Sequence, residues 1–188
     1  MKKSRRLLIF IIIAALVVTF GAIQINKLSN NPESAFLEKY GLNGLSIEEI
    51  VYSLDSTKSD PGGLGASITS EHLILFDNSE EIKLALPEDK FYLSFAPYIN
   101  QTHPCATHSL SSCQGELVNQ SVNVIVTDGN GNEIVNSEMT TMENGFVGVW
   151  LPRNMNGTIE VLYNGMSAQT SISTFSGSNT CLTTLQLS

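Results

Sequence analysis

Six cysteine and histidine residues occur in the 188-residue chain, and four of them fall within eleven positions. The segment 102–113 reads THPCATHSLSSC and contains His103, Cys105, His108 and Cys113, while Cys181 follows far along the chain. Mixed thiolate and imidazole ligands suit zinc, and thiolates select Cu(I) in particular. Two neighbouring thiols can also give up two electrons and become a disulfide. The cluster therefore predicts a soft-metal site or a redox site.

The same cysteines also fit a purely structural interpretation. Cys105 and Cys113 could form a disulfide that staples a loop, with Cys181 buried as a free thiol. The spacing lacks the two close-set ligand pairs of a zinc finger. Because three cysteines allow at most one internal disulfide, one thiol needs an explanation if the chain is exported to an oxidising compartment. Residue spacing alone leaves the staple and the metal or redox site open.

The N-terminal segment predicts export. Four of the first six residues are basic, and residues 7–23 are almost uninterruptedly apolar. This pattern is typical of a signal peptide or of an uncleaved signal anchor, which we place over residues 1–27. No Ala-x-Ala site follows the apolar run, so the sequence leaves both alternatives open, and the lack of a cysteine there excludes lipoprotein processing. The basic flank should stay in the cytoplasm, so we expect the rest of the chain to be extracytoplasmic.

The exported part is strongly acidic. All 18 acidic residues follow the apolar run, and half of the 10 basic residues lie at or before Lys27. This balance excludes nucleic acid and anionic membrane surfaces as natural partners. It is compatible with a protein that handles cations, or with charge that serves solubility alone.

The pattern of elements predicts an α+β fold. Two short helices are expected within a helical N-terminal part, residues 28–57, the first opened by Pro32 and closed by Gly41 and the second by the capping box of Ser46 and Glu49. A linker and short strands should occupy residues 58–95, and a β-rich metal-binding domain residues 96–188. The expected strands are 72–76, 82–86, 91–95, 122–126, 146–151, 158–163 and 167–173, with 96–115 as a long loop. Such spacing is typical of a mainly antiparallel, sandwich-like C-terminal domain.

Other motifs add little chemistry. The chain has no nucleophile elbow, no zinc-protease motif and no phosphate loop, so no catalytic residue is nominated. Residues 128–133 resemble a calcium loop only in part and predict a turn, and Asn-Gly pairs at 144, 156 and 164 predict hairpins. His72 is interpreted as structural. Four methionines could lend thioethers to copper, although packing is the more common role: Met139, Met142, Met155 and Met166.

The chain resembles the CueP family of bacterial periplasmic copper-binding proteins. The resemblance runs through KFYLSFAPYINQTHPCATHSLSSC at 90–113, NGFVGVWLPRNMNGTIE at 144–160 and TCLTTL at 180–185. It covers the helical part, residues 36–54, less sharply. These motifs are long and unusual, and together they extend over nearly the whole exported chain.

The resemblance implies a copper site and a place for it. Copper ligands map onto Cys105, Cys113 and Cys181, with participation of His108 and, as a further matching position, His103. The resemblance also implies copper resistance, a preference for Cu(I) and reduction of Cu(II) to Cu(I). We therefore interpret the chain mainly as a metal-binding protein, and an enzymatic reductase role stays open. Zinc is a second candidate ion, a periplasmic copper-zinc superoxide dismutase is the implied copper acceptor, and a homodimer stays open.

Two further points depend on the N-terminal segment and on the cysteines. The expected location is the periplasm, or the outer face of the cytoplasmic membrane if the segment is uncleaved and keeps the protein at the membrane. The alternative function is an exported adhesion or assembly domain that is stapled by a disulfide and has no metal role.

Overall fold

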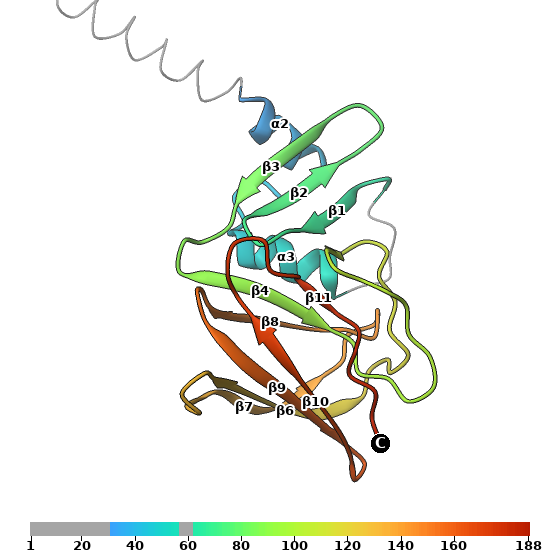
Figure 1. The fold of residues 1–188 in the computed structure, drawn as a ribbon. Coiled ribbons are helices and arrows are strands. Elements are labelled where there is room, and N and C mark those ends of the chain that lie inside the picture. Colours follow the sequence, from blue (N-terminus) through green and yellow to red (C-terminus); the bar gives the residue numbers. More distant parts are fainter. Residues whose placement is uncertain (1–30, 57–61) are drawn as a thin grey trace, which may run out of the picture. The chain divides into compact units, whose positions relative to one another are not determined.

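A computed structural model describes residues 31–56 and 62–188 of the chain (Figure 1). The expected signal peptide or anchor, residues 1–27, lies outside the described residues, as do residues 58–61 at the start of the expected linker. Over the described ranges, no helix is both long enough and apolar enough to cross a membrane.

Two short helices have the ends that the sequence predicts. Helix α2, Pro32–Lys39, begins after Asn31, whose side chain accepts the backbone N–H of Glu33, and the chain leaves it through Gly41 at a positive φ of 69°. This helix belongs to a unit of its own that ends at Asn43. Helix α3, Ile47–Asp55, belongs to the second unit, Gly44–Ser188, and its capping box between Ser46 and Glu49 is complete. Both helix predictions are confirmed.

Three small sheets make up the rest of the second unit. Their orders are β3-β2-β1-β5, β10-β9-β6-β7 and β11-β4-β8, and every pairing is antiparallel except that of β11 with β4. The strands are β1 (Gly65–Ile68), β2 (His72–Phe76), β3 (Glu81–Ala85), β4 (Lys90–Phe95), β5 (His108–Ser109), β6 (Ser121–Asp128), β7 (Glu133–Thr140), β8 (Val147–Pro152), β9 (Asn156–Tyr163), β10 (Met166–Ser173) and β11 (Cys181–Leu182).

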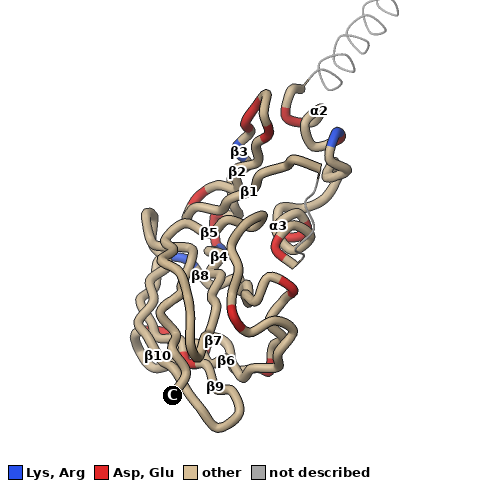
Figure 2. The backbone as a smooth tube through the Cα atoms, turned by 90° about the vertical axis from the view of Figure 1, so that its right-hand side faces the viewer, with Lys and Arg blue, Asp and Glu red and all other residues tan. Residues whose placement is uncertain are grey.

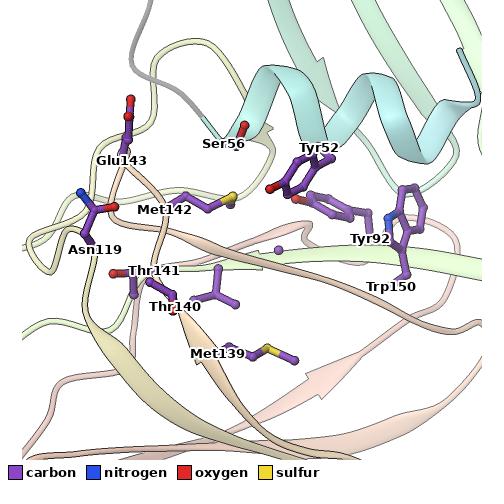
Figure 3. A pocket seen from close by; sticks show the side chains of 12 residues that line it. Tyr52, Ser56, Tyr92, Asn119, Met139, Thr140, Thr141, Met142, Glu143 and Trp150 are labelled. Carbon is purple, nitrogen blue, oxygen red and sulfur yellow. The ribbon is translucent and has the colours of Figure 1, made fainter.

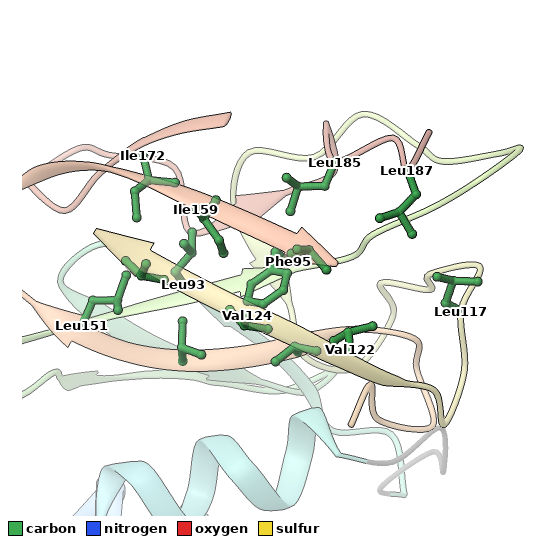
Figure 4. Packing of buried hydrophobic residues seen from close by; sticks show 14 of the residues in the cluster. Leu93, Phe95, Leu117, Val122, Val124, Leu151, Ile159, Ile172, Leu185 and Leu187 are labelled. Carbon is green, nitrogen blue, oxygen red and sulfur yellow. The ribbon is translucent and has the colours of Figure 1, made fainter. Parts of the chain in front are cut away.

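The main hydrophobic core lies between the second and third sheets (Figure 4). Val122, Val124 and Val126 alternate with more exposed residues along β6 and face this core. From the facing sheet, β4 contributes Phe91, Leu93 and Phe95, and β8 contributes its own alternating set. The predicted α+β class with a sandwich-like C-terminal part is confirmed.

Several local predictions differ from the structure. Asn156 and Gly157 are the first residues of β9 rather than a turn, and the reversal lies just before them, where Asn154 has a φ of 62°. The expected loop 96–115 contains β5, which pairs with β1. By contrast, the turn at 128–132 is confirmed, because the Asp128 carboxylate accepts the backbone N–H groups of Asn130 and Asn132.

Acidic residues are spread along the chain, with few basic residues between them (Figure 2). They occur in α3, in the β2–β3 hairpin and in several loops. The negative charge of the described residues is therefore distributed over several elements and not gathered on one.

Candidate metal centre

The cysteine and histidine residues of the site come from two segments, the stretch around β5 and strand β11. Cys105 lies just before β5, His108 begins it, Cys113 follows it, and Cys181 begins β11. The carbonyl of Ala106 accepts the backbone N–H of Cys181 at 3.1 Å, and the hydroxyl of Thr180 accepts that of His108 at 3.1 Å. These bonds hold the C-terminal strand against the segment that contains the other ligands.

Four candidate ligand atoms converge at this junction. The sulfur atoms of Cys105, Cys113 and Cys181 and a ring nitrogen of His108 all lie within 4.8 Å of one another. His103 is not part of this group, although its ring lies 6.1 Å from that of Phe146, which also contacts His108 at 4.7 Å. The structure thus brings together four of the five residues nominated from the sequence, with His103 bordering them.

The disulfide in this structure joins Cys105 and Cys181, and Cys113 is a free, half-buried thiol. The staple that the sequence suggested, Cys105 to Cys113, is therefore wrong as a pairing. Strand β11 lies alongside Cys105 and brings the two Cα atoms within 5.6 Å, although the residues are 76 positions apart. The Cys113 sulfur lies 3.7 Å from that of Cys105, so all three sulfurs share one small volume.

His108 is fully buried and its two ring nitrogens have different surroundings. Nε2 lies 2.7 Å from Oδ1 of Asp55, whereas Nδ1 makes no hydrogen bond of normal geometry, although Cys113 is close enough to interact with the ring. A buried polar atom without a partner is costly and needs an explanation. Metal-binding histidines commonly donate one N–H to a carboxylate and offer the other nitrogen to the ion. This geometry fits a role for Nδ1 as a metal ligand.

Asp55, the last residue of α3, is the centre of a buried polar network. Its Oδ2 accepts the hydroxyl of Tyr92 at 2.6 Å and, more weakly, that of Ser94 at 3.4 Å. The Asn144 amide donates to the Asp55 backbone carbonyl at 2.7 Å and to Oδ1 at 2.8 Å. The carboxylate is therefore fixed from several sides, and through it the ring of His108 is fixed as well.

Gly148 on β8 makes room for one arm of this network. A Cβ atom at this position would lie 1.8 Å from the Tyr92 hydroxyl oxygen. Tyr92 can lie across β8 and reach Asp55 only because residue 148 has no side chain. Sequence reasoning missed Asp55, Tyr92 and Asn144. A signal existed for Asp55, which follows Val51 by four residues and so places a carboxylate on the apolar face of α3.

The electrostatics of the site couple His108 to Cys113. Burial opposes the charged form of His108, but the hydrogen bond to Asp55 and the interaction with Cys113 outweigh it and raise the pKa to about 9. Burial also raises the pKa of Cys113, but interactions with His108 and His103 prevail and lower it to about 7. Cys113 therefore has thiolate character near neutral pH, which is the form that binds metals.

Glu116 holds the beginning of the ligand-bearing segment. Its Oε2 accepts three successive backbone N–H groups, those of Ile99 at 2.7 Å, Asn100 at 2.9 Å and Gln101 at 3.3 Å. The Asn100 side chain donates to Oε1 as well. These bonds, those from Asn100 foremost, lower the pKa of Glu116 to about 2. The carboxylate thus orders the chain just before His103 without itself facing the sulfurs.

Comparisons with known proteins place this site in a family context. Residues 49–186 match the family described as "periplasmic copper-binding protein CueP". A crystal structure of a protein named S.CueP is 53% identical, with a TM-score of 0.81, and the match covers 84% of this chain and 98% of that chain. The comparison with curated proteins gives no match. The matched region contains every candidate ligand and every member of the Asp55 network.

Proposed function

Because the chain belongs to the CueP family of periplasmic copper-binding proteins, we propose that it holds copper as Cu(I) on Cys105, Cys113 and Cys181, with His108 as the nitrogen ligand. The observation that supports this proposal most is the convergence of the four ligand atoms within 4.8 Å, one of them a buried nitrogen that makes no hydrogen bond of normal geometry. Thiolates select Cu(I), and imidazole is a ligand that copper accepts readily.

Copper binding on three sulfurs requires the Cys105–Cys181 disulfide to be reduced. The reduced site then has three thiols around Nδ1 of His108, and metal binding displaces protons from the thiols. His103, which interacts with Cys113, is a second nitrogen at the border of the site. Asp55 accepts the Nε2 proton of His108 and keeps Nδ1 directed at the ion.

Anaerobic titration of the reduced full-length protein with Cu(I) tests the proposal. We expect stoichiometric binding that each of C105S, C113S and C181S weakens and that the triple variant abolishes. H108N should weaken binding, whereas H72N, which changes the histidine on β2, is the matched control and should leave it intact. Undiminished binding by the triple variant would sink the idea. A parallel titration with Zn(II) shows whether the site prefers copper.

A second function, reduction of Cu(II), is favoured by the disulfide itself. The thiols of Cys105 and Cys181 would give up two electrons and two protons, form the disulfide and convert two Cu(II) ions into two Cu(I) ions. Such a reaction should consume two free thiols for every two Cu(I) ions formed. Thiol counts that stay constant while Cu(I) appears would exclude this role.

The alternative of a stapled adhesion or assembly domain differs from both copper roles in one measurement. It requires protein purified without oxygen to keep a disulfide and carry no metal, and to lose stability on reduction. Thiol and metal analysis of the same sample therefore separates the three functions.

The proposed acceptor of the copper is inferred from the family resemblance alone. A periplasmic copper-zinc superoxide dismutase is the acceptor to test, by mixing the Cu(I)-loaded protein with the copper-free dismutase and following the gain of activity. Transfer that is no faster from the loaded protein than from free Cu(I) would argue for sequestration instead.

A further inference from the structure

A pocket of about 510 Å³ lies between α3, β7 and the outer face of the β4–β8 pair (Figure 3). Its aromatic walls are Tyr52 from α3, Tyr92 from β4 and Trp150 from β8. Tyr92 and Trp150 pair across the strands, with ring centroids 4.9 Å apart. Two thioether side chains, those of Met139 and Met142, extend into the same space. The proposed copper site does not account for this pocket.

Met142 connects the pocket to the cysteines. Besides lining the pocket, it packs against the buried cluster of Ala96, Phe146 and Cys181, as Cys105 and Cys113 also do. No other pocket-lining residue belongs to that cluster within the described part of the chain. One flexible thioether therefore borders both an open pocket and the apolar cluster to which Cys181 belongs.

The turn that carries Met142 is held rigidly against the metal centre. The Met142 backbone N–H donates to the carbonyl of Phe146 at 2.8 Å, and its carbonyl accepts the N–H of Gly145 at 2.9 Å. From the same turn, Asn144 binds Asp55 and the Phe146 ring contacts His108. The backbone of Met142 is thus positioned by the same turn that positions His108, and its side chain is only partly buried.

We propose that this pocket is a low-affinity intake site for Cu(I), whose wall offers the thioethers of Met139 and Met142 at separate places, and that the ion passes from Met142 to the cysteines. The proposal rests on the Cu(I) function proposed above and adds the route to that site. Thioethers are soft ligands that favour Cu(I), and the faces of tyrosine and tryptophan attract cations.

The transfer step is a ligand exchange without electron transfer. The bonds from Cu(I) to the neutral thioethers break, bonds to cysteine sulfurs form, and the thiol protons leave to solvent. Because thiolates are stronger ligands than thioethers, the exchange runs towards the cysteines. The methionines therefore affect how fast the site fills and not how tightly it holds the ion.

Loading kinetics of the reduced full-length protein test this role directly. Cu(I) is supplied as its bicinchoninate complex, whose colour fades as the ion is taken up. M139L and M142L, which keep the volume but remove the sulfur, should slow loading several-fold and leave the equilibrium affinity unchanged. M155L and M166L are matched controls, because these methionines pack against the sandwich core and do not line the pocket. Both controls should load at the wild-type rate.

A second measurement detects the intake site without the cysteines. Trp150 is the only tryptophan of the chain, so its fluorescence reports on this pocket alone. In the C105S/C113S/C181S variant, with folding checked by circular dichroism, weak Cu(I) binding should quench Trp150, and adding M139L and M142L should abolish the quenching. If the triple variant does not fold, the loading kinetics decide the matter.

The outcomes distinguish this inference from the function on which it rests. Wild-type loading with unchanged rates in M139L and M142L overturns the intake site and leaves the thiolate site standing. A loss of equilibrium affinity in M142L also overturns it, because Met142 would then be a permanent ligand. If the wild-type protein binds no Cu(I), both proposals fail.

Discussion

The two faces of the β4–β8 pair are built on opposite principles. Phe91, Leu93 and Phe95 of β4 belong to the apolar sandwich core, whereas Tyr92 and Ser94 face α3 and bind the buried carboxylate of Asp55. Tyr92 and Ser94 are as buried as the core residues of the other face. The face towards the core stabilises the fold through apolar burial, which tolerates many combinations of apolar side chains. The face towards α3 holds the Asp55 carboxylate by hydrogen bonds, and this carboxylate orients His108.

The largest loss of stability should come from the apolar face. F95A removes a fully buried ring and should lower the free energy of unfolding by about 3–5 kcal/mol. Urea unfolding of the reduced protein measures this loss. At low urea, where F95A is still folded, Cu(I) stoichiometry should match that of the wild type. Loss of Cu(I) binding in the folded variant would show that copper binding also depends on the apolar face.

The polar face should give the largest effect on copper. D55N keeps the shape of the side chain but cannot accept every donor around it, so His108 loses its orienting partner. Mutation of such supporting residues typically lowers metal affinity by about 10–100-fold. Competition with a Cu(I) chelator measures the affinity. D89N, at an exposed position before β4, is the control and should bind Cu(I) like the wild type. Unchanged affinity in D55N would contradict the orienting role.

A smaller change on the polar face is Y92F. It removes the hydroxyl that donates to Asp55 Oδ2 and should cost about 1–2 kcal/mol of unfolding free energy, because a buried acceptor then loses its better partner. Its effect on copper affinity should be smaller than that of D55N, since His108 keeps its carboxylate. Denaturant unfolding and chelator competition on the same preparation compare the two effects. An affinity loss equal to that of D55N would mean that Tyr92 positions the carboxylate as strictly as the carboxylate positions His108.

The smallest effect should come from Glu116, which lies outside both faces. Its pKa is lowered from 4.5 to about 2 by the N–H groups that it accepts. A carboxylate whose pKa is lower in the folded state adds stability above pH 4.5, and this contribution disappears as the pH falls towards 2. E116Q should therefore be less stable than the wild type at neutral pH, and the difference should shrink on acidification. Thermal unfolding across this pH range checks the trend. A stability difference between E116Q and the wild type that grows at low pH would contradict this prediction.

The contrast between the apolar face and the polar network also explains which features could be predicted from the sequence. Alternation of Val122, Val124 and Val126 identified a sandwich strand because side chains in strands alternate between two faces. The capping box fixed the start of α3 because it is a local signal. The Asp55 network could not be found in this way, since it joins α3, β4, β5 and the turn at Asn144, which are far apart in sequence.

The cysteine pairing failed for the same reason. Cys105 and Cys113 are near each other in sequence, and proximity favoured a local staple. Strand β11 instead pairs in parallel with β4 and brings Cys181 to Cys105, a contact that no local pattern encodes. The local cluster nominated His103 and His108, and the family resemblance added the distant Cys181, because it carries long-range information that spacing does not.

The parallel pairing of β11 with β4 also sets the order in which the protein can mature. Cys181 follows Cys105 by 76 residues, so the third sulfur arrives only after β6 to β10 have been synthesised. Contacts of such long sequence separation form late, because the intervening chain must first be ordered. A nascent chain exposes Cys105 and Cys113 before their partner exists. The Cys105–Cys181 disulfide can therefore close only after almost the whole chain has been made.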